Sequence, residues 1–411
     1  MNIWLLRASE PIPTTAPNIR LMRMGMIAEE LTKRGHHVIW FSNTFDHFQK
    51  KQLFEKDTIL KIQENYSVYL LHALKYKKNI SAQRILHHKI IASKFRKISR
   101  KLEKPDLIYV AHPTIEFSEE AVKYGKKYNV PTIVDIRDLW PDIFYHNLSP
   151  KLRLLATPYI KWMDYKTKNI MKNAFAINGV SEEMVNWGLK KGKREKKKYD
   201  RYFYIGYEKT KQDEEETIKE SIIDKNKFNI CFFATINNQF DYEKISILAK
   251  RLEEKDNNIM IHICGDGPQM SEFLKKLQEI SNVKLWGWTE KDKLTTILKD
   301  SKLGLAPYKN TFDFQMGVSN KFAEYISYGL PIALMSDGYM KEILKENDCG
   351  ITTGDMKKMC QEIIDLKSDE QKYQQMSQRA LNLYQEKFEA HKIYEDLADY
   401  LEQIVQEKRR K

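Results

Sequence analysis

The chain has 411 residues, of which 42% are hydrophobic and 30% are charged, and its formal net charge is +13 at pH 7. That length predicts two or three domains with cores large enough to need no disulfide or metal support. The four cysteines form no CxxC pair, and no apolar run approaches the roughly 18 residues of a membrane span, which argues against disulfide-rich and membrane-spanning classes. We therefore expect a cytoplasmic protein, and the positive charge favours anionic partners.

Short apolar runs and amphipathic segments alternate through the first half of the chain, which is the pattern of parallel α/β layers. Strands are expected at Asn2–Leu6, His37–Ser42, Asp106–Ala111, Thr132–Asp135 and Ala174–Gly179. Helices are expected after a cap at Asn18 and over Ala82–Leu102, Ile115–Tyr128 and Leu152–Lys172. The lysine-rich segment Gly188–Asp200 interrupts the pattern and predicts either a solvated loop or a contact with lipid headgroups or an acidic polymer.

The segment Ala82–Leu102 interleaves basic residues with an apolar set that includes Ile85, Ile91 and Phe95. Such a helix has two interpretations. It either lies on an anionic membrane surface, which would make the protein peripheral on the cytoplasmic face of the inner membrane, or packs its apolar stripe on the sheet as an ordinary outer helix.

The second half of the chain restarts the alternation after a charged stretch, so we place a domain boundary near residue 208. Strands are expected at Ile230–Thr235, Ile259–Gly265, Val283–Trp286, Leu303–Tyr308 and Pro331–Met335. Helices are expected between them and over almost all of the chain after Gly354. The predicted architecture is α/β, with two tandem Rossmann-like domains at 1–207 and 208–385 that face a central cleft, and a C-terminal helix at 386–411 that packs back on the first domain.

Several common nucleotide and metal motifs are absent from the sequence. It contains no GxGxxG after the first strand, no GxxxxGK[ST] and no HExxH, and no histidine pairs with a cysteine at metal spacing. These absences argue against a dinucleotide dehydrogenase, a P-loop NTPase and a zinc enzyme. Asp135 and Asp138 are only weak evidence for a hard cation, so no metal is expected.

The most informative stretch is Lys309–Pro331, where a strand feeds a loop and then a helix. Gly317 lets the backbone approach a ligand, and Ser319 or Asn320 can cap the helix, whose first amides form an anion site. Lys321 places a cation in the first turn, where a bound phosphate would relieve its conflict with the helix dipole. Glu324, one turn on, can accept hydrogen bonds from a ribose. The alternative is an ordinary capped helix with a surface Lys–Glu pair.

The second half of the chain resembles the nucleotide-sugar domain of GT-B glycosyltransferases, in particular the retaining family 4. The resemblance rests on Gly265-Asp266-Gly267-Pro268, on Val283 to Trp288, on Leu305 to Tyr308, and on Asn320-Lys321-Phe322-Ala323-Glu324-Tyr325 through Pro331-Ile332. The first half resembles the acceptor domain through Gly35-His36-His37-Val38 and the string from Asp135 to Asp142. That RDLWPD string is similar to a branch that builds bacterial O-antigen and capsule sugars, including N-acetylfucosaminyl transferases.

The resemblance implies a donor site in the second domain. Glu324 matches the acid that holds the nucleotide ribose, and Lys321 with Gly317, Val318, Ser319 and Asn320 matches the diphosphate cradle. Met316 stands where relatives carry an acid that touches the transferred sugar. Thr235 lies in a loop that has no cation here, and Gly265 ends a neighbouring strand. Trp288 either packs on the base or belongs to the core.

In the first domain, the resemblance places Arg137 and Asp138 at the end of a strand, where many relatives have a histidine. Asp138 is expected to assist an acceptor hydroxyl and Arg137 to contact a phosphate; the alternative is a structural Arg137–Asp138 pair. His112 is a second catalytic candidate or a satisfied loop residue. Asn18 and Arg20 are the expected acceptor contacts.

The implied reaction is sugar transfer from a nucleotide-diphosphate sugar, expected to be UDP-linked, to a hydroxyl of a saccharide or polyprenyl-diphosphate-linked acceptor. The resemblance implies a retaining hexosyltransferase of bacterial surface polysaccharide synthesis, with no cofactor. The alternatives are a sugar-nucleotide epimerase or hydrolase of the same fold and a non-catalytic GT-B partner subunit. Nucleic acid is not an expected partner, because the chain has no recognition helix, zinc finger or aromatic RNA-binding string.

Overall fold

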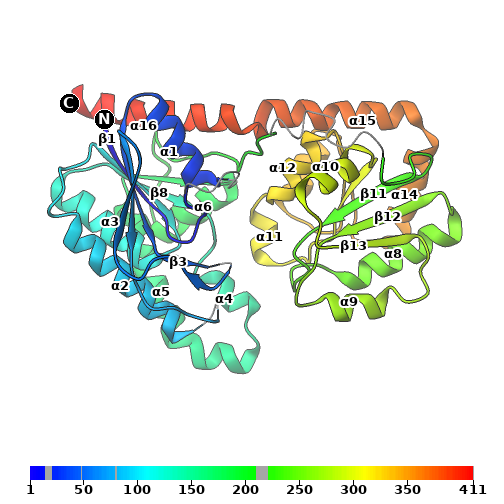
Figure 1. Cartoon of the computed structure of the whole chain (residues 1–411), viewed down its shortest axis with the longest axis horizontal. Coiled ribbons are helices and arrows are strands. Elements are labelled where there is room, and N and C mark those ends of the chain that lie inside the picture. The colour runs from blue at the N-terminus through cyan, green and yellow to red at the C-terminus, as the bar shows by residue number, and fades with distance from the viewer. Residues whose placement is uncertain (14–20, 48, 79–80, 210–220, 411) are drawn as a thin grey trace. The chain divides into compact units, whose positions relative to one another are not determined.

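A computed structural model describes residues 1–13, 21–47, 49–78, 81–209 and 221–410. The chain forms two compact α/β units, one of Met1–Tyr204 with Lys392–Lys411 and the other of Ile205–His391 (Figure 1). Among the described residues, no helix combines the length and apolarity needed to cross a bilayer. The expectation of two Rossmann-like halves built on parallel sheets is confirmed.

Unit 1 is built on an eight-stranded sheet with the order β10-β9-β8-β7-β1-β2-β6-β5, in which only the β5–β6 pair is antiparallel. The strands are β1 (Asn2–Leu6), β2 (His37–Asn43), β5 (Thr58–Gln63), β6 (Tyr66–Leu71), β7 (Leu107–His112), β8 (Thr132–Ile136), β9 (Ala176–Gly179) and β10 (Arg201–Tyr202). The short strands β3 (Phe45–Asp46) and β4 (Lys51–Gln52) pair separately. Strands β5 and β6 were not predicted. The edge strand β5 alternates half-buried and exposed residues and has no continuous apolar run.

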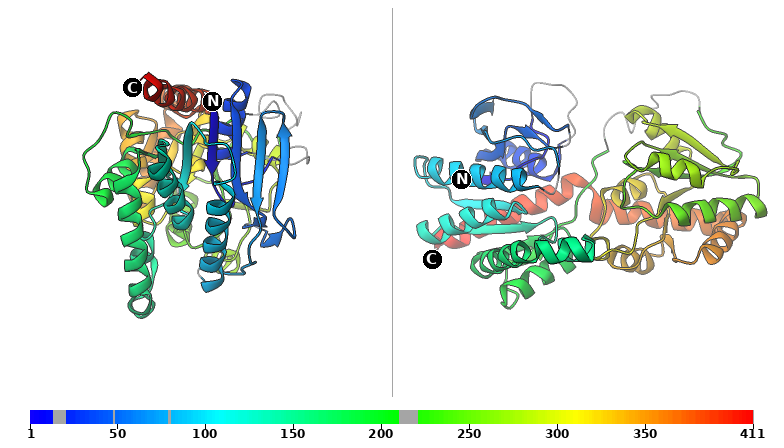
Figure 2. Two further views of the ribbon diagram at one scale, coloured as in Figure 1. Left: turned by 90° about the vertical axis from the view of Figure 1, so that its left-hand side faces the viewer. Right: turned by 90° about the horizontal axis from the view of Figure 1, so that it is seen from below.

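Helices cover both faces of this sheet (Figures 1 and 2). They are α1 (Arg23–Lys33), α2 (Ala82–Ile98), α3 (Ile115–Tyr128), α4 (Asp142–Asn147), α5 (Pro150–Asn173), α6 (Glu182–Gly192) and α16 (Ala390–Arg410). The expected loop at Gly188–Asp200 is wrong in its first part, because α6 continues to Gly192 and Lys191 is anchored there by Asp142 and Asp164. Helix α16 belongs to unit 1 from Lys392, and its Glu402 lies 2.7 Å from the ring of His36.

The helix α2 packs as an outer helix of unit 1. Its Ile91, Ala92 and Phe95 are fully or almost fully buried, and the Phe95 ring packs edge-on against Phe41 and Phe117. These residues of the apolar stripe predicted at Ala82–Leu102 therefore pack in the core of the unit.

Unit 2 carries a six-stranded parallel sheet with the order β13-β12-β11-β14-β15-β16. The strands are β11 (Phe228–Phe233), β12 (Ile259–Cys264), β13 (Val283–Gly287), β14 (Leu303–Ala306), β15 (Ile332–Leu334) and β16 (Gly350–Thr352). The helices are α8 (Tyr242–Lys255), α9 (Met270–Lys276), α10 (Lys291–Lys299), α11 (Phe312–Met316), α12 (Asn320–Ser327), α13 (Tyr339–Glu346), α14 (Met356–Ser368), α15 (Glu370–Leu383) and the π-helical turn η1 (Tyr384–Phe388).

The position of α12 on this sheet is set by a buried tyrosine. The Tyr325 hydroxyl lies 3.1 Å from the carbonyl oxygen of Cys231 and 3.0 Å from that of Leu305, so it bonds to β11 and β14 together. A side chain at Gly304 would lie 2.5 Å from the Tyr325 ring, so glycine is required for this close approach. This packing fixes the start of α12 at the carboxyl ends of β11 and β14.

Candidate functional site

The strand order of unit 2 reverses direction between β11 and β14, and the carboxyl ends of the strands at such a point form a ligand crevice. The loops that follow these two strands are tied together. The amide of Lys309 donates to the carbonyl of Gln239 at 2.9 Å, and the amide of Asp241 donates to that of Pro307 at 2.8 Å. These two hydrogen bonds hold the loops after β11 and β14 together beside the N-terminus of α12.

The N-terminus of α12 is capped as a helix that can receive an anion. Ser319 is the N-cap, and its hydroxyl accepts a hydrogen bond from the Phe322 amide at 3.3 Å. Gly317 and Val318 are buried immediately before it, and Asn320 is exposed. The first-turn amides have no intrahelical acceptors, and together with the helix dipole they favour a bound phosphate.

Lys321 is a partly buried cation at this helix start. Its ammonium lies 5.8 Å from the centroid of the Phe233 ring and 5.4 Å from that of Phe240, which belong to β11 and the loop after it. Burial lowers the pKa of Lys321, while the negative charge of Glu324 raises it in part. The site thus holds a desolvated positive charge beside the first amides of α12.

Glu324 lies one turn into α12, and its exposed fraction is only 9%. Glu324 is therefore not the exposed partner of a surface Lys–Glu pair, which was the alternative prediction. Met316 ends α11 and is half-buried.

Two further donor-site candidates lie on the loops after β11 and β12. Gly265 has a φ of +138°, and a side chain there would lie 1.8 Å from the carbonyl oxygen of Ala234, so the two loops touch. Thr235 is exposed beside this contact. Trp288, which follows β13, is 78% exposed and does not belong to the core.

Unit 1 has its own reversal of strand order, between β1 and β7, which run parallel. Arg7 follows β1 and donates from Nη1 to the carbonyl of Pro113, which follows β7, at 2.6 Å. The amide of Arg137, which follows β8, donates to the carbonyl of His112 at 2.8 Å. The first of these bonds joins the two strand ends at the reversal, and the second joins the neighbouring ends of β7 and β8.

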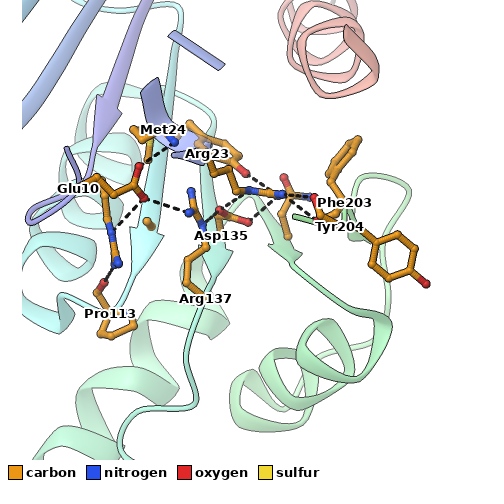
Figure 3. Close-up of polar contacts among 12 residues, drawn as sticks. Glu10, Arg23, Met24, Pro113, Asp135, Arg137, Phe203 and Tyr204 are labelled. Carbon is orange, nitrogen blue, oxygen red and sulfur yellow. Dashed lines mark hydrogen bonds and ion pairs between the residues drawn. The ribbon is translucent and has the colours of Figure 1, made fainter. Parts of the chain in front are cut away.

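A buried ion cluster lies behind this edge (Figure 3). The Arg23 Nε and Nη2 atoms each lie 3.2 Å from a carboxylate oxygen of Asp135, and both side chains are almost completely buried. Arg137 bonds to Asp135 as well, and its Nη1 lies 3.1 Å from Glu10. Glu10 also accepts from the amide of Met24 at 2.9 Å.

The alternative of a structural Arg137–Asp138 pair is wrong, because Arg137 pairs with Asp135 and Glu10. Arg137 turns to Asp135, because residues two apart at the end of a strand point to the same side, whereas adjacent residues point apart. Asp138 instead accepts from the Leu139 amide at 2.8 Å and from Trp140 Nε1 at 3.2 Å. The Asp138 carboxylate therefore stabilises the conformation of the loop in which it lies.

His112 is fully buried, and its Nε2 lies 3.4 Å from the carbonyl oxygen of Trp140. Burial lowers the pKa of His112 to about 4, so the ring is neutral at physiological pH. Among the described residues, neither His112 Nδ1 nor Arg137 Nη2 has a hydrogen-bond partner, although both are buried. Asn18 and Arg20 lie outside the described residues.

Sequence reasoning missed Arg7, Glu10 and Arg23, because nothing local marks a charged residue as buried. Within the parts of the chain that the structure covers, no group of three or more His, Cys, Asp or Glu residues is arranged to hold a metal ion.

Comparison with known families finds one match in each unit. Residues 23–197 match the family model described as Glycosyltransferase Family 4, and residues 227–369 match the model described as Glycosyl transferases group 1. Together the two matches cover most of the chain. A comparison with curated proteins finds no match.

Solved structures share the fold along the whole chain at low sequence identity. HepE of Anabaena in complex with UDP has a TM-score of 0.67 and 13% identity, covering 98% of this chain and 100% of its own. Sucrose-phosphate synthase of Thermosynechococcus elongatus has a TM-score of 0.72 and 12% identity, covering 98% and 99%. WaaG, a glycosyltransferase involved in lipopolysaccharide biosynthesis, has a TM-score of 0.62 and 11% identity, covering 97% and 99%. The two family matches and the fold together make this chain a glycosyltransferase of the GT-B type.

Proposed function

We propose that the protein transfers a hexose from a UDP-sugar to a hydroxyl group, with retention of anomeric configuration. The observation that carries the proposal is the start of α12, where the partly buried ammonium of Lys321 and the first helix amides lie together at the carboxyl ends of β11 and β14. HepE, similar in fold, was solved with UDP and with UDP-glucose. Retention is expected from the likeness to family 4.

In the proposed donor site, Lys321 and the amides of Gly317 to Asn320 hold the diphosphate, and Glu324 accepts hydrogen bonds from the ribose. Breaking the anomeric bond adds negative charge to the leaving diphosphate. The ammonium and the helix dipole are aimed at that charge, so they stabilise the transition state more than the ground state. Trp288 is exposed enough to stack on the base, with Thr235 and Gly265 lining the neighbouring loops.

In unit 1, we assign the acceptor to the strand ends at Arg7, His112 and Arg137. Arg137 Nη2 is buried without a partner and points to a ligand that accepts a hydrogen bond, such as a phosphate of the acceptor. The neutral His112 ring has a free Nδ1 that can take part in orienting a hydroxyl. We expect the acceptor to be a saccharide or a polyprenyl-diphosphate-linked sugar of bacterial surface polysaccharide synthesis.

A non-catalytic GT-B partner subunit is the second candidate function. Met316 stands in place of the acid expected at the sugar, and the Ala234–Gln239 loop has no cation, and both features favour binding without turnover. Release of UDP from the donor in the presence of an acceptor extract separates the two functions.

A thermal-shift screen tests the donor class. We expect UDP and a UDP-sugar to raise the melting temperature of the protein more than the guanosine, thymidine and cytidine counterparts do. A selective response to another nucleotide would show that the donor carries that nucleotide instead of UDP. No response to any of the nucleotides would overturn the proposal. Glu324→Gln is expected to weaken the response, because a neutral amide is a poorer acceptor for the ribose hydroxyls.

A further inference from the structure

The turn between α4 and α5 carries an unusual set of exposed aliphatic side chains. Leu152, Leu154 and Leu155, on the first turns of α5, are 56%, 76% and 80% exposed. Lys151 and Arg153 alternate with them and are exposed as well. We call Lys151, Leu152, Arg153, Leu154 and Leu155 the α5 tip. Water-exposed leucines in such a cluster are unfavourable unless another surface covers them.

Two hydrogen bonds hold the turn that carries the α5 tip. Arg153 Nη1 donates to the carbonyl of Tyr145, in α4, at 3.2 Å, and the Leu148 amide donates to the carbonyl of Phe144 at 3.2 Å. These bonds fix the α4–α5 turn while the three leucines stay in solvent. Figures 1 and 2 show this turn at the end of unit 1 opposite α16.

The apolar stripe of the tip continues along α5. Leu152 and Leu155 lie on the same helix face as Ala156, Tyr159 and Met163, which follow at helical spacing. Those three residues line an apolar pocket between α2, α3, α4 and α5. The first turns of α5 therefore extend a core-facing stripe into solvent.

The charged side chains in the sequence around the α5 tip are all positive. No Asp or Glu occurs between Asp142 and Asp164 in the sequence, whereas Lys151, Arg153 and Lys161 do. Asp142 and Asp164 are themselves engaged by Lys191. A surface with exposed leucines and uncompensated cations matches an anionic phospholipid bilayer in both respects.

We propose that the α5 tip inserts its leucines into the surface of an anionic phospholipid bilayer, with its cations at the lipid headgroups. This site differs from the basic segment at α2, whose apolar stripe is buried and whose Leu86 is the one large aliphatic side chain exposed among its described residues. The inference rests on the proposed function in one respect, since docking would bring unit 1 to a lipid-linked acceptor.

Sedimentation with vesicles tests the proposal on the full chain. The wild type is expected to sediment with vesicles of phosphatidylglycerol and phosphatidylcholine in equal parts, and weakly with pure phosphatidylcholine. The double variant Leu154→Asp/Leu155→Asp is expected to weaken binding at least about tenfold, because each leucine contributes several buried carbons. A double Gln variant of Lys151 and Lys161, which keeps the bond of Arg153 to Tyr145, should weaken binding to the anionic vesicles only.

Leu86→Asp is the matched control, because it adds the same charge to an exposed leucine of α2, and it should bind as the wild type does. The proposal is overturned if the wild type does not sediment, if the double Asp variant binds normally, or if Leu86→Asp alone abolishes binding. It is also overturned if light scattering shows a dimer that the double Asp variant dissolves, because the tip would then join two copies. UDP-induced thermal shifts of all variants should be unchanged, which separates this test from that of the donor site.

Discussion

Replacing Lys321 with methionine should separate the stability of unit 2 from its affinity for the donor. Methionine keeps most of the apolar stem that packs near the Phe233 and Phe240 rings and removes only the charge. In the free protein, the ammonium is desolvated enough to lower its pKa. We therefore expect the free variant to be as stable as the wild type, or more stable by up to about 1 kcal/mol.

The effect on binding should have the opposite sign. Two unit charges 4 Å apart interact by about 4 kcal/mol at the effective dielectric of a partly exposed site, and desolvation offsets part of this. A charge-assisted hydrogen bond is worth about 1.5–3 kcal/mol net, so the dissociation constant of UDP should rise by roughly 10- to 150-fold. Titration calorimetry measures this constant, and thermal unfolding measures the stability.

Lys345→Met is the control, because Lys345 is exposed in the last turn of α13, away from the carboxyl ends of the strands. It should change neither quantity. The reasoning would fail if Lys321→Met bound UDP as tightly as the wild type. It would also fail if the free variant were clearly less stable, since Lys321 would then hold the fold and not a phosphate.

Three further predictions concern other groups. Trp288→Ala should leave the melting temperature unchanged, because the ring is exposed, and should weaken UDP affinity by several-fold; unchanged affinity would remove the base-stacking role. Arg23→Met should lower the free energy of unfolding by about 3 kcal/mol or more, because it leaves the buried Asp135 with one arginine instead of two; urea denaturation checks this, and a neutral result would contradict the cluster's structural role. Burial lowers the pKa of His112 and His262 to about 4, below the unfolded value of about 6.5, so the folded chain binds fewer protons between these values. Stability should therefore be complete above pH 6.5 and fall as the pH drops towards 4, by at most about 3 kcal/mol per histidine in melting experiments; a gain on acidification would refute the assignment.

The fold class could be predicted because its signal is local. Buried parallel strands appear as short apolar runs, and each of the expected strands of unit 2 overlaps an observed one from β11 to β15. The edge strands β5 and β16 were missed, since a half-exposed or three-residue strand has little apolar pattern to detect. The lysine-rich segment was misjudged at its start, because charge alone does not reveal that α6 continues.

The donor-site candidates from Met316 to Glu324 are contiguous, so their order and spacing already place a capped helix start, a cation and an acid on one turn. The strand edge and ion cluster of unit 1 are different. Arg23, Asp135 and the carbonyl of Phe203 meet across 112 and 180 positions of the chain, and Arg137 reaches Glu10 across 127. By itself, then, the sequence determined most of the buried strands and the capped helix start that we propose as the donor site. Only the tertiary structure decided which charges are buried together and which leucines stay in water, because burial depends on neighbours that are remote along the chain.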